Sequence, residues 1–270
     1  SCGRGTPYGE GGLALARFAR ELGFTGLQMG PQGKTSPINR SPYDGSVFSR
    51  SELSLDLKAL AFDARWEGLL SEETWRRVVD RNPRPDGLRV AYGYASAAYA
   101  EAGDEVCRRF QGARHAQLPL ATRFEAELSR LWQTQRWVRD DAVYDALMRK
   151  YDRLPWSAWP RTGKAAIDRT LTNPAPAAVA TWAARRRDLE RRYAGAIERY
   201  VLIQHVLLEQ HRLFQSHLQA MGLRIYGDVQ IGLSQRDAWS RQALLLNRYW
   251  LGAPPSRTNL EGQPWSYPVL

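Results

Sequence analysis

The residues Thr25-Gly26-Leu27-Gln28-Met29-Gly30-Pro31 decide the fold class. Before them, residues 11–22 carry apolar side chains at helical spacing, and Gly23 is expected to end that helix. After them, residues 30–44 are rich in glycine, proline, serine and asparagine, which excludes a continuous helix. The pattern predicts a helix, a short strand and a long ordered loop, and such loops at strand ends tend to carry function.

The same order of elements returns later in the sequence. A long amphipathic helix is expected from Ala196 to Met221, Gly222 ends it, and residues 223–233 form a β-run. Between the two, residues 71–192 are nearly all helical, with Ser71 as the expected N-cap. Helices that feed strands with long polar loops at their C-terminal ends suit a parallel α/β barrel, in which ligand sites lie at those ends. The final segment, residues 252–270, is expected to be a loop rich in proline and glycine.

Length and composition place the chain among globular proteins with a proper core, since it has 270 residues, of which 43% are hydrophobic. No apolar run approaches the roughly 18 residues needed to span a bilayer, so no membrane partner is expected. Only Cys2 and Cys107 are present, which excludes a disulfide framework and a CxxC metal or redox pair. A reducing, cytoplasmic location without a cofactor is the simplest expectation.

The formal net charge of +10 raises the question of a nucleic-acid partner. The densest basic run, residues 185–192, is interleaved with acids on an expected helix. That arrangement is typical of a solvated face with ion pairs between neighbouring turns. No nucleic-acid partner is therefore expected, and an arginine-rich nucleic-acid binder ranks last among the hypotheses.

Two patterns in the sequence resemble a phosphate-binding loop and a histidine metal site, but neither has the spacing that such a site requires. The run Gly30-Pro31-Gln32-Gly33-Lys34-Thr35 is similar to a phosphate-binding loop, but that loop needs a glycine where Gln28 stands and a helix that starts at its lysine. It is interpreted as an ordered, turn-rich loop. His205, His211 and His217 are six residues apart and therefore turn about 120° from one another on a helix, so no metal site is expected from them.

The tryptophans Trp156, Trp159 and Trp265 lie in segments rich in proline. Flat aromatic faces in loops suit the apolar face of a sugar ring, although anchoring in the core is equally common. Both interpretations stay open from the sequence.

Several segments together carry a resemblance to a known family. The family stretch WQVLPLGPTG…SPYQS is similar to residues 27–33 followed by Ser41-Pro42-Tyr43-Asp44, and its pWxxWP motif matches residues 155–160. Its strand GDIPIYV is similar to residues 227–233, and its DVWA to residues 237–240. Its loop GVPPDYFSxxGQxWGNPLY resembles residues 252–268. In this order, these segments resemble glycoside hydrolase family 77, the 4-alpha-glucanotransferases.

The resemblance implies an α/β fold, the N-terminal part of a (β/α)8 TIM barrel with a large, mainly helical insertion, helix-dominated overall. Residues 1–70 would form the first part of the barrel with the substrate loop. Residues 71–195 would form the helical insertion subdomain, and residues 196–270 a barrel helix, a strand and a lid-like loop.

The resemblance also implies an activity, the transfer of alpha-1,4-glucan segments between maltooligosaccharides by a retaining mechanism. In such chemistry one carboxylate attacks the anomeric carbon and another protonates the leaving oxygen. By the family's order, both carboxylates lie beyond Leu270. This span is therefore expected to be inactive alone, with the remaining barrel half in the same or another chain.

The resemblance also implies which residues of this span bind substrate. Ser41, Tyr43 and Asp44 match the SPYQ loop, and the first two are expected to line the donor sugar site. Asp228 matches the aspartate of the family's third strand, where a carboxylate would hold sugar hydroxyls, and a turn-capping role is the alternative. Trp265 matches the aromatic residue of the lid-like loop.

The chain departs from the family pattern at several of these positions. Asp44 stands for the glutamine of SPYQ, and Gly232 for the tyrosine of the third strand. In the final loop, Ser256-Arg257-Thr258 replaces Asp-Tyr-Phe, and Ser266-Tyr267 replaces Gly-Asn. These departures put acceptor specificity in doubt. They keep a second hypothesis open, a non-catalytic glucan-binding or scaffold protein on a degenerate barrel.

Overall fold

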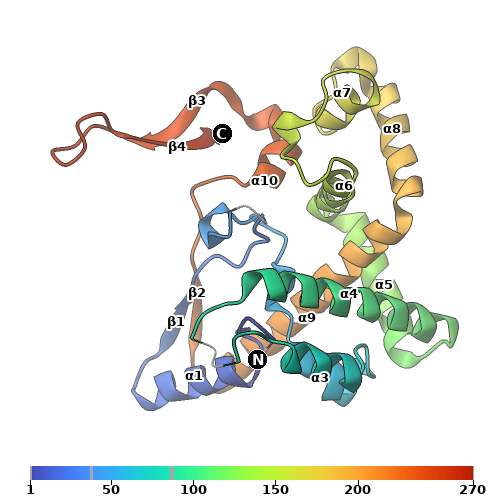
Figure 1. Ribbon diagram of the computed structural model, residues 1–270, viewed down its shortest axis with the longest axis vertical. Helices are drawn as coiled ribbons and strands as arrows, with labels where there is room; N and C mark the ends of the chain where they lie inside the picture. Colours follow the sequence, from blue (N-terminus) through green and yellow to red (C-terminus); the bar gives the residue numbers. More distant parts are fainter. Residues whose placement is uncertain (1, 37–38, 86–87, 270) are drawn as a thin grey trace. The chain divides into compact units, whose positions relative to one another are not determined.

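The computed structural model describes residues 2–36, 39–85 and 88–269 (Figure 1). The chain packs as two compact units. Unit 1 comprises residues 1–32, 50–135 and 199–228, and unit 2 comprises residues 33–49, 136–198 and 229–270. The helices of residues 72–134 thus pack with the first strand, so this grouping differs from the three consecutive segments expected from the sequence, whose status as domains stays a prediction.

Unit 1 is built on a parallel pair of strands that are far apart in the sequence. Strand β1 (Gly26–Met29) pairs with β2 (Arg224–Gly227), and Leu27 lies opposite Ile225 (Figure 1). Helix α1 (Glu10–Glu21) precedes β1, and helix α9 (Ala194–Ala220) precedes β2. A helix followed by a strand in each half is the unit from which a parallel α/β fold is assembled.

A glycine ends each of the two helices that precede these strands. Gly23 and Gly222 have φ of 89° and 71°, in the left-handed region that only glycine adopts at little cost. The turn made there directs the chain from the helix into the strand. The two helix ends predicted from the sequence are therefore confirmed.

Four further helices complete unit 1: α2 (Leu57–Phe62), α3 (Glu72–Asp80), α4 (Tyr92–His115) and α5 (Pro119–Thr134). Ser71 caps α3 as expected, because its Oγ accepts a hydrogen bond from the amide of Thr74 at 3.2 Å. One hydrophobic core joins these helices to α9. Its largest fully buried side chains include Trp66, Tyr99, Phe110 and Phe124.

Unit 2 consists of helices and one hairpin. Its helices are α6 (Arg136–Lys150), α7 (Gly163–Arg169), α8 (Val179–Arg192) and the short α10 (Gln235–Ser240). Trp159 is 1% exposed and lies against the rings of Tyr144, Tyr151 and Trp239, with ring centres 4.7 to 6.5 Å apart. Of the two interpretations that the sequence left open, Trp159 therefore takes the core one.

The basic run of α8 is only partly the solvated face expected from the sequence. Arg185 is 8% exposed and binds the fully buried carboxylate of Asp168 through its Nε at 2.8 Å. Arg186 pairs with Asp140 at 2.7 Å. The expectation of a solvated side chain is wrong for Arg185, because it is buried against Asp168, an acid that comes from α7. The expected pairs between neighbouring turns are present at Asp188, which binds Arg185 and Arg191.

The end of the chain is a hairpin and not the expected loop. Strand β3 (Leu246–Ala253) pairs in antiparallel fashion with β4 (Gln263–Val269). Pro264 and Pro268 led to the loop expectation, but a two-stranded hairpin has only edge strands, and an edge strand tolerates residues without an N–H. The expected β-run of residues 223–233 is also shorter, since β2 ends at Gly227.

Among the described residues, no helix has both the length and the apolar character that crossing a bilayer requires.

Candidate substrate site

The loop of residues 33–49 in unit 2 is closed on itself by its main chain. The amide of Lys34 donates to the carbonyl of Ser49 at 2.9 Å, and the amide of Ser46 donates to the carbonyl of Lys34 at 3.1 Å. A Cβ on Gly33 would lie 2.0 Å from the carbonyl oxygen of Ser46. The two ends of the loop therefore come too close at Gly33 for any side chain to fit there. In its described residues, 33–36 and 39–49, the loop is thus held by main-chain contacts, as expected for the ordered loop that the sequence predicted.

This loop contains a short 3-10 turn, η1 (Pro42–Asp44), which carries two of the residues expected at the sugar site, Tyr43 and Asp44. Ser41 caps it, since its Oγ accepts from the amide of Tyr43 at 3.3 Å. The ring of Tyr43 is 53% exposed, and the carboxylate of Asp44 accepts hydrogen bonds from Asn39 and Tyr267. The turn therefore presents an aromatic side chain to solvent from a fixed backbone.

Helix α10 and helix α6 hold the rest of the loop. The carboxylate of Asp237, 1% exposed, accepts from the amide of Val47 at 3.0 Å and from Ser234 Oγ at 2.6 Å. The ring of Phe48 stacks on Trp137, with centres 6.0 Å apart. The loop is in this way bound to two helices.

Lys34 shows why the phosphate-loop motif is a false match. Its Nζ pairs with Asp145 Oδ1 on α6 at 2.7 Å, and Arg236 binds the same carboxylate oxygen at 3.1 Å. No helix starts at Lys34, so the amide dipoles that would hold a phosphate are not assembled there. The interpretation as a turn-rich loop is confirmed.

The pKa values of two aspartates on α6 are shifted in opposite directions. Burial raises the pKa of Asp141 to about 6, and nearby Arg236 only partly offsets this. Asp145 is also penalised by burial, but Lys34 and Arg236 hold its pKa well below the usual range. Asp145 is therefore a permanent anchor for the loop, whereas Asp141 changes charge in mildly acidic solution.

Trp265 lies on β4 in the same unit and is 42% exposed. The strand pairing passes from Leu251 opposite Tyr267 to Gly252 opposite Pro264, so Trp265 stands in a bulge of β4. Bulges re-aim a side chain and are frequent next to active sites. The hydrogen bond from Tyr267 to Asp44 joins this strand to the turn that carries Ser41 and Tyr43.

Asp228 belongs to unit 1, directly after β2. Its amide donates to the carbonyl of Met29 at 3.1 Å, which extends the parallel pair by one bond at the C-terminal ends of both strands. Ligand sites of parallel barrels lie at these ends. The role of Asp228 in holding sugar hydroxyls, and its grouping with the sugar-site residues of unit 2, stay predictions.

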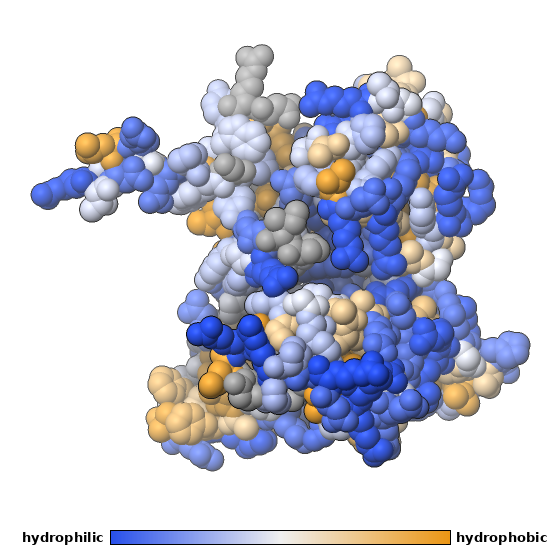
Figure 2. All heavy atoms as spheres, viewed as in Figure 1, coloured by the Kyte–Doolittle hydropathy of each residue, from blue (hydrophilic) through white to orange (hydrophobic). Residues whose placement is uncertain are grey.

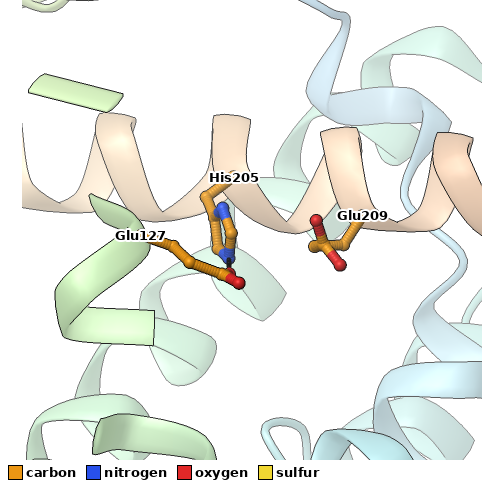
Figure 3. A group of neighbouring side chains, drawn as sticks. All are labelled: Glu127, His205 and Glu209. Carbon is orange, nitrogen blue, oxygen red and sulfur yellow. Dashed lines mark ion pairs between the residues drawn. The ribbon is translucent and has the colours of Figure 1, made fainter. Parts of the chain in front are cut away.

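One side-chain cluster was missed by the analysis of histidine spacing. His205 on α9 lies between Glu127 of α5 and Glu209 one turn further along α9, with ligand atoms within 4.8 Å of one another (Figure 3). His205 Nε2 and Glu127 Oε2 are 2.9 Å apart, yet neither atom has a hydrogen bond of good geometry. The spacing of His205 and Glu209 on one helix face was available from the sequence, but the helix that supplies Glu127 was not.

These three side chains offer a donor set that suits a transition metal, but their surroundings oppose a cation. Glu209 is already bound to Arg212. Burial, together with the positive charges of Arg212, Arg123 and Arg130, lowers the pKa of His205 to about 4, although the carboxylate of Glu209 raises it. We therefore interpret the cluster as a buried neutral histidine beside a carboxylate.

The chain is similar in sequence to known 4-alpha-glucanotransferases. The sequence profile of the 4-alpha-glucanotransferase family matches residues 3–270. The chain is 23% identical to the chloroplastic/amyloplastic 4-alpha-glucanotransferase of Oryza sativa subsp. japonica, over 97% of this chain and 41% of that protein. It is 25% identical to the 4-alpha-glucanotransferase of Thermus thermophilus, over 97% of this chain and 49% of that protein.

A solved structure has a similar fold. Amylomaltase from Streptococcus agalactiae, in complex with acarbose, matches 97% of this chain and 49% of its own with a TM-score of 0.73 and 21% identity. The expected fold class, the N-terminal part of the family's α/β fold with a large helical insertion, is thereby confirmed. The chain spans about half the length or less of these relatives. With a profile match over nearly its whole length, the chain belongs to the 4-alpha-glucanotransferase family, glycoside hydrolase family 77.

Proposed function

We propose that the protein containing this chain is a 4-alpha-glucanotransferase that transfers alpha-1,4-glucan segments between maltooligosaccharides with retention of configuration. The observation that carries the proposal is the family match over residues 3–270. The closed loop that presents Tyr43, and its link through Asp44 to the strand of Trp265, support it. The family match favours this enzyme over a non-catalytic scaffold.

This chain's contribution is to hold the sugar. The exposed ring of Tyr43 and the indole of Trp265 offer flat apolar faces with polar edges, which suit sugar rings. Ser41 sets the turn, and Asp228 would accept hydrogen bonds from sugar hydroxyls at the strand ends. The attacking carboxylate and the acid that protonates the leaving oxygen would follow Leu270, so this span by itself would be inactive.

The proposal includes a partner for unit 1, the remaining half of the barrel in the same or another chain. Helix α1 carries two large apolar side chains, Leu15 and Phe18, that are 63% and 57% exposed, and Leu22 and Phe24 follow the helix at 60% and 57%. Figure 2 shows hydrophobic atoms gathered where α1 lies. Exposed apolar patches of this kind mark surfaces that another part of a protein covers. The unpaired edges of β1 and β2 would be covered at the same time.

A cytoplasmic location fits the two cysteines, since neither forms a disulfide and Cys107 is buried. Nucleic acid is not proposed as a partner, because Arg185 and Arg186 of the basic run are engaged with carboxylates.

The deciding experiment is a disproportionation assay on the full-length protein with maltotriose. We expect glucose and longer maltooligosaccharides as products, and no products from residues 1–270 alone. Full-length protein that binds maltooligosaccharides without forming glucose or longer oligomers would contradict the transferase and favour the scaffold.

A further inference from the structure

Three positions at which this chain departs from the family pattern meet at one place in unit 2. Asp44 lies in the η1 turn, Gly232 follows β2, and Tyr267 lies on β4. Tyr267 and Asp44 are 223 residues apart in the sequence and share a hydrogen bond. The departures are therefore neighbours in space although nothing in the sequence links them.

Gly232 leaves the space that the ring of Tyr267 occupies. A Cβ at position 232 would lie 2.7 Å from Cζ of Tyr267 and 2.8 Å from both of its Cε atoms. Real Cβ atoms essentially never come so close, so any side chain at 232 would have to displace the ring. Gly232 is not among the glycines with positive φ, so space is the reason for glycine here and not backbone conformation.

The phenol end of the same ring is anchored. Tyr267 Oη donates to Oδ1 of Asp44, and this bond is the main cause that raises the pKa of Tyr267 to about 12. A carboxylate acceptor makes a stronger hydrogen bond than the neutral amide oxygen of a glutamine would. Gln230, two residues before Gly232, donates to the carbonyl of Gly45 next to Asp44. The turn, the segment after β2 and the hairpin are thus tied together at this point.

Tyr267 also stands next to the bulge of β4 that carries Trp265. Pairing with β3 resumes at Tyr267, opposite Leu251, so Tyr267 is the first fixed residue after the bulge. An anchor there sets the direction in which the bulged strand presents its side chains. Without it, the hairpin would be held to the turn by fewer contacts.

We propose that Tyr267, Gly232 and Asp44 form one anchor, in which Tyr267 takes the space left by glycine and positions Trp265 relative to the turn of Tyr43. Tyr267 is a positioning residue for the glucan site, and this role rests on the proposed function. The three departures from the family pattern are one coupled change that replaces an aromatic side chain from the third strand by one from the hairpin.

The test uses the full-length protein and a cycle of variants: G232A, G232Y, Y267N, Y267F and the double variant G232Y/Y267N. G112A is the matched control, because a Cβ on that glycine meets nothing within 4 Å. Two measurements are made on each form. Amide hydrogen exchange of residues 246–269 reports the anchoring, and KM and kcat for maltotriose transfer report the positioning.

G232A displaces only the end of a side chain, so the fold should persist while the ring of Tyr267 moves. We expect faster exchange in the hairpin for G232A, G232Y and Y267N. KM for maltotriose should rise by about fivefold, because the ring leaves its place and its hydrogen bond is lost, with little change in kcat. Y267F, which keeps the ring and loses the donor, should be intermediate. The double variant, which restores the family pair, should return both exchange and KM to within about twofold of the unaltered protein.

Additive effects in the double variant, or hairpin exchange unchanged by G232A, would overturn the anchor. The two proposals fail in different ways. If no form transfers glucan, the proposed function and the positioning role both fail, whereas the exchange measurement still decides whether Tyr267 and Gly232 are coupled.

Discussion

Gln204 forms two hydrogen bonds with the main chain of Arg50, a residue 154 positions earlier: its Oε1 accepts from the amide at 2.8 Å and its Nε2 donates to the carbonyl at 3.0 Å. Gln210 makes the same pair of bonds with Asp56, at 2.9 and 3.1 Å. Both glutamines are at most 3% exposed. Helix α9 therefore holds an irregular segment of unit 1 by satisfying its backbone as a neighbouring strand would.

Gln204→Leu should destabilise the protein by roughly 2–4 kcal/mol, because it removes the partners of the main-chain N–H and C=O of Arg50. Gln210→Leu should cost a similar amount, since the geometry is the same. Gln215→Leu, on the exposed face of α9, is the control and should change stability by less than about 0.5 kcal/mol. Urea unfolding measures the stability of all three variants. Equal midpoints for Gln204→Leu and Gln215→Leu would show that the hydrogen bonds of Gln204 with Arg50 do not stabilise the protein.

Asp168→Asn should be among the most damaging substitutions in unit 2. The carboxylate is 0% exposed and accepts from Arg185 at 2.8 and 2.9 Å, from Lys150 at 2.7 Å and from Tyr151 at 2.7 Å. Neutralising it leaves the buried guanidinium of Arg185 with less compensation, at a cost of roughly 3–5 kcal/mol.

Thermal unfolding followed by near-ultraviolet circular dichroism reports this loss, since Trp159 and Trp239 lie in the same unit. Arg191→Gln removes a partner of Asp188 whose side chain is 78% exposed and should cost less than about 1 kcal/mol. A loss as small for Asp168→Asn as for Arg191→Gln would show that the buried network is not stabilising.

His205→Gln should change how stability depends on pH. Burial lowers the pKa of His205 from 6.5 to about 4, so the folded state binds fewer protons than the unfolded state between these values. The contribution of neutral His205 to the unfolding free energy is therefore fully present above pH 6.5, and it is lost as the pH falls toward 4. The unfolding free energy should therefore drop by up to about 3 kcal/mol across this range in the unaltered protein.

In His205→Gln this part of the drop should be absent, because glutamine does not titrate. Urea unfolding at several pH values between 4 and 7 measures it. His217→Gln, at an exposed position on the same helix, should keep the full drop. If the unfolding free energy fell equally with pH in His205→Gln and His217→Gln, His205 would not be held neutral by burial.

Trp265→Ala should weaken glucan binding in the full-length protein. Loss of an aromatic face under a sugar ring should raise KM for maltotriose by about 3- to 10-fold, while Trp265→Phe should retain most of the affinity. Trp250→Ala is the matched control, because Trp250 is 65% exposed on the paired strand and is not assigned to the site. Steady-state kinetics with varied maltotriose separates the effects, and equal changes in both alanine variants would contradict a specific role for Trp265.

The local features of this protein could be predicted from the order of its residues. Gly23, Gly222 and Ser71 end or begin helices through interactions within a few residues, so their roles could be predicted. The succession of motifs, from the SPY turn to the GQxW loop, identified the family and placed Ser41 and Tyr43 on an ordered loop.

The interactions between distant segments could be seen only in the folded chain. The pairing of β3 with β4 was missed because prolines look like loop residues in sequence, although edge strands accept them. The burial of Arg185 depends on Asp168, and the environment of His205 depends on Glu127, each from another helix. The contact of Tyr267 with Gly232 joins positions that no periodicity connects. Such contacts depend on how elements pack, and packing is a property of the whole chain that local spacing does not encode.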